Sequence, residues 1–441
     1  MSRKGGLKMS DLWNDPAFWA VLLFIIPLLL RVPIAIALGF ASITVAYFWD
    51  LGVDMTSYNF FASIVKYPLL SVPFFILAGN IMDKASIADK IIDFIKELVG
   101  SMTGGLAIAA IGVAVFWGAV SGSTSATVAA IGAILIPGMV EAGYDKPFAT
   151  AVISVSSGLA IIIPPSITFI LYAVITGVSV GAIFAAGFLP GFVMAAFMMT
   201  SAWLTSRKHG YRGQPRSNGL MGVLVAARKA FWALMTPVVI LGGIYGGVFT
   251  PTEAASVACF YGLFVGVVIY RKIGWKEIYE ILLESLNSSA AVMIVCTTAG
   301  LYSWIGSTVG LIEKASGLLL GVSSNQYVIL FMIYFILFIG GMLLDGVSML
   351  YVFMPILIPL MKQFNWDPVW FGVMVTTMVA IGTVTPPVAM NLYVGCRISR
   401  ITIEELTPPV LPLLFATILA LAFLSFFPSV TLFLPKYLGL M

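Results

Sequence analysis

Charged, cysteine and histidine residues are scarce in this sequence. Lys, Arg, Asp and Glu make up 10% of its 441 residues, against about a quarter in soluble domains. The 3 cysteines, Cys259, Cys296 and Cys396, are far apart and lie in or at the ends of apolar runs. They predict neither a disulfide framework nor a metal site. The single histidine, His209, excludes a catalytic cluster of histidines.

Apolar residues are abundant and come in long runs. Hydrophobic residues form 60% of the chain, and runs long enough to cross a bilayer recur from Phe18 to the end. A transmembrane helix needs about 20 such residues. Because many further runs follow the first, that run is not a cleaved signal peptide. We therefore expect an all-α polytopic membrane protein.

Lys and Arg gather in a few short stretches. The positive-inside rule places such stretches on the cytoplasmic side. The longest, Arg207–Lys229, is interpreted as an orientation signal near lipid headgroups; we expect the lipid bilayer as its partner and no nucleic acid. The stretches are Arg31, 84–96, Lys146, 207–229, 271–276, Arg397 and Arg400.

The chain contains an internal duplication. Residues 118–168 and 340–390 contain the same short motifs in the same order and align without a gap: Ile-Leu-Ile-Pro, then aspartate, then Pro-Pro. Repeats at a fixed spacing indicate a repeated architecture. The matched positions, which all keep one constant spacing, are Pro137 and Pro359, Met139 and Met361, Asp145 and Asp367, and the pairs 164–165 and 386–387.

Each repeat is predicted to contain a re-entrant helical hairpin and a broken transmembrane helix. The arms of the first hairpin are about 14 residues long, too short to span alone. The first hairpin opens from the inside and the second from the outside, so the two repeats have inverted topology. Inverted repeats with interrupted helices are typical of secondary transporters with a site near the membrane midplane.

These patterns divide the chain into five segments. We expect a polar N-terminal segment (1–16), a first inverted repeat (17–206; hairpin about 104–141, broken helix about 148–176), a basic cytoplasmic loop (207–230), a second inverted repeat (231–407; hairpin about 325–362, broken helix about 368–395) and a C-terminal transmembrane helix (408–441).

Two smaller elements are also predicted. Apolar residues of 83–97 fall on one helical face and charges on the other, which predicts a helix lying in the membrane interface. Residues 305–320 would be its counterpart in the second repeat. Near residue 250, Thr250 or Thr252 can cap a helix whose first turn holds Glu253.

The helix breaks suggest where ions and substrate bind. Two successive prolines remove backbone donors and leave carbonyls without partners, which is costly in hydrocarbon unless protein, water or an ion satisfies them. Carbonyl and Ser/Thr oxygens suit an alkali cation, and half-helix N-termini favour an anion. Each repeat thus offers one cation cage, with an anionic substrate between them.

The predicted residues are as follows. The first cage combines Ser121, Ser123, Thr124 and Ser125 with Ile163, Pro164 and Ser166. The second combines Gly341, Asp345 and Gly346 with Thr383, Thr385, Pro386 and Asn391. The substrate site combines Ser123, Pro165, Thr168, Asp345 and Pro387.

Structural interpretations of the same residues remain open. Gly, Ser and Thr also let membrane helices approach closely, and lone prolines are common kinks. Asp345 is the only carboxylate in a hairpin tip, where an acid is rare without a function, but it could instead cap the second arm. Arg31 is interpreted as a cytoplasmic anchor.

The motifs resemble the large membrane subunit (M, DctM type) of tripartite ATP-independent periplasmic (TRAP) transporters. The resemblance covers nearly the whole chain after residue 17. The matching stretches are Arg-Val-Pro-Ile-Ala-Ile-Ala-Leu-Gly from Arg31, Ser-Val-Pro-Phe-Phe-Ile-Leu-Ala-Gly-Asn from Ser71, Gly-Ala-Val-Ser-Gly-Ser from Gly118, Ile-Pro-Pro-Ser from Ile163, Gly-Val-Phe-Thr-Pro-Thr-Glu-Ala-Ala from Gly247, Leu-Asp-Gly from Leu344 and Thr-Pro-Pro-Val-Ala-Met-Asn-Leu from Thr385.

The resemblance implies an elevator-type symporter of the ion transporter superfamily in the bacterial inner membrane. Sodium ions, with no other cofactor, would drive uptake of an organic acid anion, commonly a C4-dicarboxylate or a sialic acid. Implied partners are a small four-helix membrane subunit (Q type) and a periplasmic substrate-binding protein (P type). We expect Q as a separate chain, because no four-helix extension fits before Phe18. The family often has Gly where Ala389 stands.

Other functions fit the sequence less well. A stand-alone sodium- or proton-coupled carboxylate transporter, with Asp345 carrying the proton, is the nearest alternative. An intramembrane enzyme is not expected, because no histidine lies in a span and Asp345 is alone at depth. A receptor or scaffold of bundled helices would not need two polar-tipped hairpins.

Overall fold

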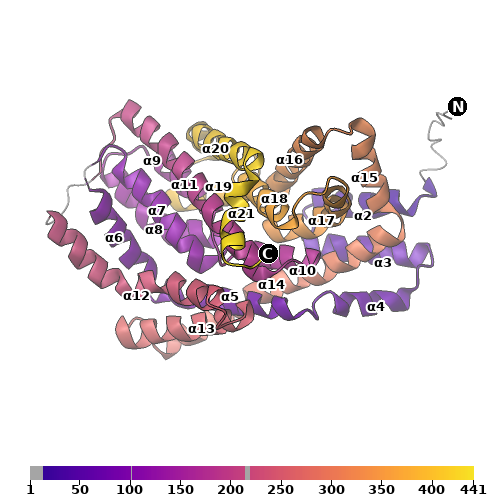
Figure 1. Cartoon of the computed structure of the whole chain (residues 1–441), viewed down its shortest axis with the longest axis horizontal. Helices are drawn as coiled ribbons and strands as arrows, with labels where there is room; N and C mark the ends of the chain where they lie inside the picture. The colour runs from indigo at the N-terminus through magenta and orange to yellow at the C-terminus, as the bar shows by residue number, and fades with distance from the viewer. Residues whose placement is uncertain (1–12, 101, 214–218) are drawn as a thin grey trace. The chain divides into compact units, whose positions relative to one another are not determined.

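The computed structural model describes residues 13–100, 102–213 and 219–441, and Figure 1 shows the chain. The described residues form helices and one isolated β-bridge between Thr103 and Arg212. Most of the predicted N-terminal segment, residues 1–12, lies outside them. The chain divides into two compact units. Their boundaries at 289–290, 333–334 and 346–347 fall within helices, whereas those at 66–67 and 365–366 fall between helices.

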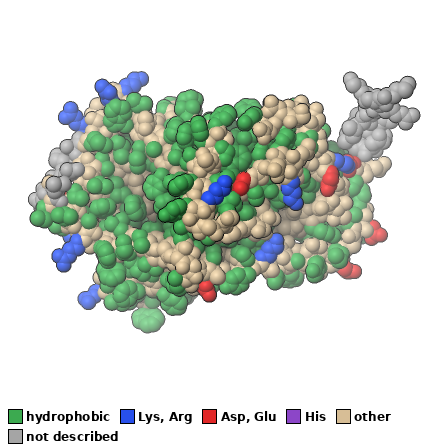
Figure 2. All heavy atoms as spheres, in the orientation of Figure 1, with side chains coloured by type: hydrophobic (Ala, Val, Ile, Leu, Met, Phe, Trp, Pro, Cys, Tyr) green, Lys and Arg blue, Asp and Glu red, His purple; other side chains and the backbone are tan. Residues whose placement is uncertain are grey.

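Eight of the described helices are long and apolar enough to cross a bilayer, or nine if the bent pair Val53–Ala62 and Tyr67–Lys84 forms one span. Large apolar side chains point outward from several of them; Phe260 is 75% exposed and Phe331 69%. Hydrophobic side chains cover much of the face shown in Figure 2, and the charged groups on it are few. This is the surface of a multi-pass membrane protein.

The first unit comes from Met1–Lys66, Ala290–Ile333 and Val347–Asn365. The second half of its longest helix packs closely on its N-terminal helices: a Cβ built on Gly300 would lie 2.1 Å from Oγ of Ser63. Lys314 pairs with Asp15 at 2.7 Å. Its helices are α2 (Pro16–Leu29), α3 (Ile34–Phe48), α4 (Val53–Ala62), the second half of α14 (Trp275–Thr308), α15 (Leu311–Val322), the start of α16 (Gln326–Leu343) and most of α17 (Gly346–Gln363).

The second unit comes from Tyr67–Ser289, Tyr334–Gly346 and Trp366–Met441. Its most buried helix is α18 (Pro368–Gly382), in which every residue from Val369 onward is buried. The other elements are η1 (Tyr67–Leu70), α5 (Ser71–Lys84), α6 (Ile87–Val99), α7 (Gly105–Ser121), α8 (Thr124–Glu141), α9 (Lys146–Ser156), η2 (Ser157–Ile161), α10 (Ile167–Thr176), α11 (Val180–His209), α12 (Gly219–Tyr245), α13 (Pro251–Leu263), the π-helix η3 (Phe264–Ile269), the start of α14, the end of α16, α19 (Met390–Ser399), α20 (Ile403–Phe426) and α21 (Pro428–Tyr437).

Both predicted hairpins have helical arms at the predicted places. Hairpin 1 consists of α7 and α8, which lie side by side in Figure 1. Hairpin 2 consists of α16 and α17. The constant spacing of the repeats extends to the helix bounds: α8 and α17 match at both ends, and α9 and α18 begin at the matching positions Lys146 and Pro368. The predicted cap before α13 is Thr250, which forms a capping box with Glu253.

The predicted interfacial helices have different bounds. Helix α5 continues to Lys84, and Ser86 (φ 56°) interrupts the chain before α6 begins at Ile87, so 83–97 is not one helix. In the second repeat, α14 continues to Thr308, and Gly310 (φ 72°) separates it from α15. Both helices stop where a residue adopts the left-handed conformation, which ends a helix.

Helices also extend into segments where we did not expect them. The expected basic loop 207–230 is partly helical, because α11 reaches His209 and α12 begins at Gly219. Helix α20 begins at Ile403, before the expected start at 408, because Thr402 and Glu405 form a capping box. Prolines within it do not end it, and α21 follows as a separate helix. Helix α4 was not predicted.

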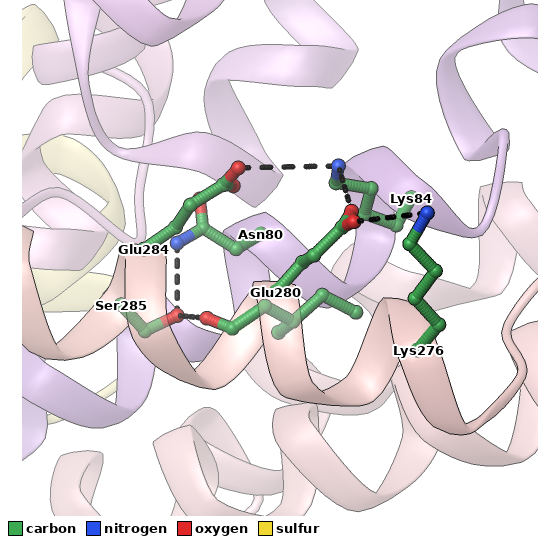
Figure 3. A network of polar contacts seen from close by, with 7 residues as sticks. Asn80, Lys84, Lys276, Glu280, Glu284 and Ser285 are labelled. Atoms are coloured by element: carbon green, nitrogen blue, oxygen red, sulfur yellow. Dashed lines mark hydrogen bonds and ion pairs between the residues drawn. The ribbon is translucent and has the colours of Figure 1, made fainter.

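A polar network joins α5 to the start of α14 within the second unit (Figure 3). Lys84 pairs with Glu280 at 3.3 Å and with Glu284 at 3.9 Å. One turn earlier on α5, Asn80 donates to Oγ of Ser285 at 2.8 Å. The network therefore fixes the part of α5 that carries the Ser71–Asn80 motif, next to Gly79, whose Cβ would lie 3.6 Å from Cα of Ser121 in hairpin 1.

Candidate functional site

The tip of hairpin 1 is shorter than expected. Gly122 (φ 61°) and Ser123 are the only residues between α7 and α8, so Thr124 and Ser125 form the first turn of α8. Ser123 has an extended backbone, and its carbonyl accepts the Thr127 hydroxyl at 2.8 Å and the Ser121 hydroxyl at 3.4 Å. The tip thus concentrates hydroxyl and carbonyl oxygens at a helix N-terminus.

The first helix break lies directly against this tip. It comprises residues 162–166 between η2 and α10, with a cis bond between Pro164 and Pro165. A Cβ on Gly118 would lie 2.9 Å from Cα of Ala160, and one on Gly122 would lie 3.2 Å from the Pro165 carbonyl oxygen. These short approaches require glycine on the hairpin, because a side chain would push the two segments apart.

Ser166 closes the first break. Its hydroxyl donates to the Ile161 carbonyl at 2.7 Å and accepts the Phe169 amide at 3.4 Å, and the residue is fully buried. Ser166 therefore caps α10 and satisfies one carbonyl freed by the prolines. Helix α11 covers the same break: a Cβ on Gly187 would lie 2.4 Å from the Ile162 carbonyl oxygen.

The second break has the same parts. Residues 383–389 separate α18 from α19 and include a cis bond between Pro386 and Pro387. The hydroxyls of Thr383 and Thr385 donate to carbonyls of α18 at 3.0 and 2.6 Å. Asn391, in the first turn of α19, donates from Nδ2 to Oγ1 of Thr383 at 3.4 Å. Polar side chains thus turn back onto the broken helix end.

Hairpin 2 packs closely on the end of α18 at the second break, just as hairpin 1 packs closely on the first break. Its tip is only Leu344 and Asp345, because Gly341 still belongs to α16. A Cβ on Gly382 would lie 2.6 Å from Cα of Gly341, so Gly341 is placed by helix packing. Asp345 is half-buried and directly precedes α17, where a side chain can cap the helix.

Segments from both predicted repeats meet within the second unit. Oγ1 of Thr124 donates to Oδ1 of Asn391 at 3.0 Å. A Cβ on Gly158 would lie 3.5 Å from the Ala380 carbonyl oxygen, so η2 and the end of α18, which lead into the two breaks, are neighbours. A Cβ on Gly346 would lie 3.6 Å from Oγ1 of Thr168.

The predicted site residues differ in how deeply they are buried. Pro387 is exposed, and its carbonyl accepts the Tyr393 hydroxyl at 3.2 Å. Pro386 and Ser125 are half-buried, whereas Pro164, Pro165 and Ile163 are buried. Sequence reasoning did not predict the close-packing role of four glycines, Gly118, Gly158, Gly187 and Gly382. Gly382 matches Ala160 at the repeat spacing. The duplication thus places a small residue at the same position in both repeats, from which this close packing could have been predicted.

The oxygen atoms at the breaks and hairpin tips are of the types that a hard cation prefers. They are hydroxyl, amide and main-chain carbonyl oxygens, which suit alkali and alkaline-earth ions and not soft metals. Within the described ranges, no three His, Cys, Asp or Glu side chains group as a metal site. The N-termini of α8 and α10 add partial positive charge that favours an anion nearby.

Comparisons with known sequences identify the family. The family model described as "Tripartite ATP-independent periplasmic transporter, DctM component" matches residues 21–430. The chain is 34% identical to the C4-dicarboxylate TRAP transporter large permease protein DctM of Rhodobacter capsulatus, covering 95% of this chain and 98% of that protein. It is 35% identical to the sialic acid TRAP transporter large permease protein SiaM of Vibrio cholerae, covering 91% and 95%.

A longer relative and two solved structures are also similar. The chain is 36% identical to the isethionate TRAP transporter permease protein DctMQ of Oleidesulfovibrio alaskensis over 93% of its length, but it spans only 65% of that protein. Its fold is similar to the YdaH transporter of Alcanivorax borkumensis (TM-score 0.64, 14% identity, 93% and 98% covered) and to MtrF of Neisseria gonorrhoeae (TM-score 0.56, 16% identity, 91% and 94% covered).

These matches confirm the resemblance seen in the motifs and the all-helical membrane fold. They assign a transport function and not an enzymatic one. This multi-pass membrane protein belongs to the family of the DctM component of tripartite ATP-independent periplasmic transporters.

Proposed function

We propose that this chain is the membrane carrier of a sodium-coupled symporter that imports an organic acid anion. Two inverted repeats, 17–206 and 231–407, would each supply one hairpin and one broken helix to a site near the middle of the bacterial inner membrane. Elevator-type movement of that site would give alternating access. The C-terminal helix, 408–441 in the predicted division, would lie outside the repeats.

The observation that carries the proposal is the meeting of two helix breaks and a hairpin tip. Thr124 and Asn391 are 267 positions apart in the sequence, yet their side chains bond at 3.0 Å. Such irregular backbone is tolerated at membrane depth only where it is buried in protein or lines a polar cavity. Its gathering within one unit therefore supports a binding site and argues against separate structural kinks.

The available oxygens support sodium as the coupling ion. The tip carbonyl and hydroxyls of Ser121, Ser123 and Thr124 would form the first cage with the break at Pro164. Thr383, Thr385 and Asn391 would form the second, with Asp345 supplying charge from the tip of hairpin 2. Asp345 is the natural candidate for contact with both ion and substrate, since no other acid lies in a hairpin tip.

Substrate class and partners are proposed from the family. The relatives are named for C4-dicarboxylate, sialic acid and isethionate, which are organic acids. An anion fits between the cages because sodium would balance its charge. A periplasmic binding protein (P type) would deliver it, and a small four-helix membrane subunit (Q type) would complete the carrier.

Uptake into proteoliposomes tests the proposal. The chain would be reconstituted with its small subunit, and labelled succinate and sialic acid offered with and without the binding protein, in sodium or in potassium. Uptake of at least one anion that requires both sodium and the binding protein is expected. Uptake that persists in potassium would contradict sodium coupling.

The same experiment separates the alternative. A stand-alone carboxylate transporter would take up the anion without the binding protein, and a proton-coupled one would respond to an imposed pH gradient in potassium. Either result would replace the proposed three-component sodium symport by that alternative.

A further inference from the structure

One amide side chain carries a hydrogen-bond path from the first repeat into the second. Oγ1 of Thr124 donates to Oδ1 of Asn391 at 3.0 Å, and Nδ2 of Asn391 donates to Oγ1 of Thr383 at 3.4 Å. The Thr383 hydroxyl then donates to the Ala380 carbonyl at 3.0 Å. Each hydroxyl donates one proton, so the path has a single direction from hairpin 1 to the end of α18.

The path is held in a fixed place. Asn391 is 1% exposed, and its backbone amide also donates to the Thr383 carbonyl at 3.4 Å. A buried amide that loses a partner carries a desolvation penalty, so the side chain has little freedom to turn away. The Ala380 carbonyl at the far end lies beside Gly158 of η2, the helix that leads into the first break.

The path has no equivalent at the matching positions of the other repeat. At the repeat spacing, Thr124 corresponds to Gly346 and Asn391 to Phe169. Those positions carry neither a hydroxyl nor an amide. Gly346 instead approaches Thr168 closely, where an added Cβ would lie 3.6 Å from its Oγ1. The duplication therefore predicts packing between the repeats. The directed hydrogen-bond path occurs only between Thr124 and Asn391 and has no counterpart between Gly346 and Phe169.

We propose that Asn391 is a positioning residue that couples the two cation cages, so that sodium bound in the first raises the affinity of the second. This inference rests on the sodium coupling proposed above. A cation on Oγ1 of Thr124 polarises the hydroxyl and makes it a stronger donor to Asn391, because hydrogen bonds in a chain strengthen one another. The fixed amide then orients Thr383 for the second ion. Coupling between sites is reciprocal.

Equilibrium binding of sodium to the purified full-length chain tests the coupling. Sodium chloride would replace potassium chloride at constant total salt, and bound radioactive sodium would be measured against free sodium concentration. The wild-type curve should be sigmoidal, with a Hill coefficient above 1. Thr124→Val should raise the half-saturating sodium concentration by roughly 2- to 12-fold, the equivalent of one hydrogen bond, and bring the Hill coefficient to about 1.

Three further variants make the result specific. Thr124→Ser keeps the hydroxyl and should restore cooperativity. Thr383→Val breaks the other end of the path and should lower the Hill coefficient as Thr124→Val does, which also provides a test if Thr124→Val fails to fold. Thr417→Val is the control, because this buried hydroxyl donates at 2.7 Å to the carbonyl of Leu414 in its own helix; it should keep the wild-type curve.

The outcomes separate this inference from the proposed function. A sodium response with the wild-type Hill coefficient in Thr124→Val, or in Thr383→Val if the first does not fold, would overturn the coupling and leave sodium symport standing. A wild-type Hill coefficient of 1 would also overturn it. The absence of any wild-type response to sodium would contradict the proposed function itself.

Discussion

Replacing Gly382 by alanine should force hairpin 2 away from α18. The added Cβ would lie 2.6 Å from Cα of Gly341, whereas ordinary contact begins at 3.4 Å, so the helices must separate by the difference, 0.8 Å. The obstacle is backbone and cannot rotate aside. Overpacking of this kind costs about 1–3 kcal/mol, and alanine's higher helix propensity offsets up to about 1 kcal/mol. The net loss of stability is therefore about 0–3 kcal/mol.

The effect on transport should be larger than the effect on stability. A displacement close to 1 Å can cost on the order of 10²-fold where groups must be aligned, and Gly382 directly precedes Thr383 of the proposed second cage. We expect sodium-dependent uptake to fall by roughly 10- to 100-fold while the purified protein remains folded. Uptake in proteoliposomes and thermal unfolding would be measured on the same preparations.

Gly242→Ala is the matched control. Gly242 lies in α12, and nothing stands within 4 Å of the Cβ that alanine would add. This variant should keep wild-type uptake and gain up to about 1 kcal/mol of stability. If Gly382→Ala behaved like Gly242→Ala in both measurements, the close packing of hairpin 2 on α18 would be refuted.

Three further substitutions test Asp345, Ser166 and, outside the site, Tyr211. Asp345→Asn keeps the size of the side chain but removes its charge, and should reduce uptake at least ~10-fold at an unchanged protein level; unchanged uptake would assign Asp345 to helix capping. Ser166→Ala uncaps α10 and leaves a buried carbonyl unpaired, so thermal unfolding should show a loss of about 1–3 kcal/mol, and an unchanged unfolding temperature would contradict this role. Burial and the hydrogen bond to Asp145 raise the pKa of Tyr211 to about 12. The folded protein thus holds this proton more tightly, and the resulting stability is complete below pH 10 and lost between pH 10 and 12. Tyr211→Phe should therefore be less stable than wild type at neutral pH by an amount that shrinks over that range; a constant difference would count against it.

The hairpins and breaks were predictable because their causes are local. Proline pairs cannot continue a helix, and Gly122 and Ser123 favour a tight reversal. Because the spacing is constant, each helix boundary in one predicted repeat indicates the matching boundary in the other. Accordingly, α17 begins at the position that matches the start of α8. Chain order and local chemistry were sufficient for these elements.

The remaining differences have tertiary or capping causes. The start of α20 depends on the reciprocal bonds of Thr402 and Glu405, which outweighed the prolines that follow. The pairing of Thr124 with Asn391 could not be read from the sequence, because it joins residues that the repeat pattern does not relate. Gly341 was expected in an open tip, yet continued helix and contact with Gly382 place it in α16. Packing partners decided each of these features.

Equilibrium binding of radioactive sodium to the purified chain tests the central claim most directly. The claim is that oxygens at the two proline breaks and hairpin tips hold sodium ions that couple to anion transport. Saturable binding that excess unlabelled sodium displaces and potassium does not is predicted, with weaker binding in both Thr124→Val and Thr385→Val. Binding that is absent, or that is the same in wild type and in both variants, would contradict it.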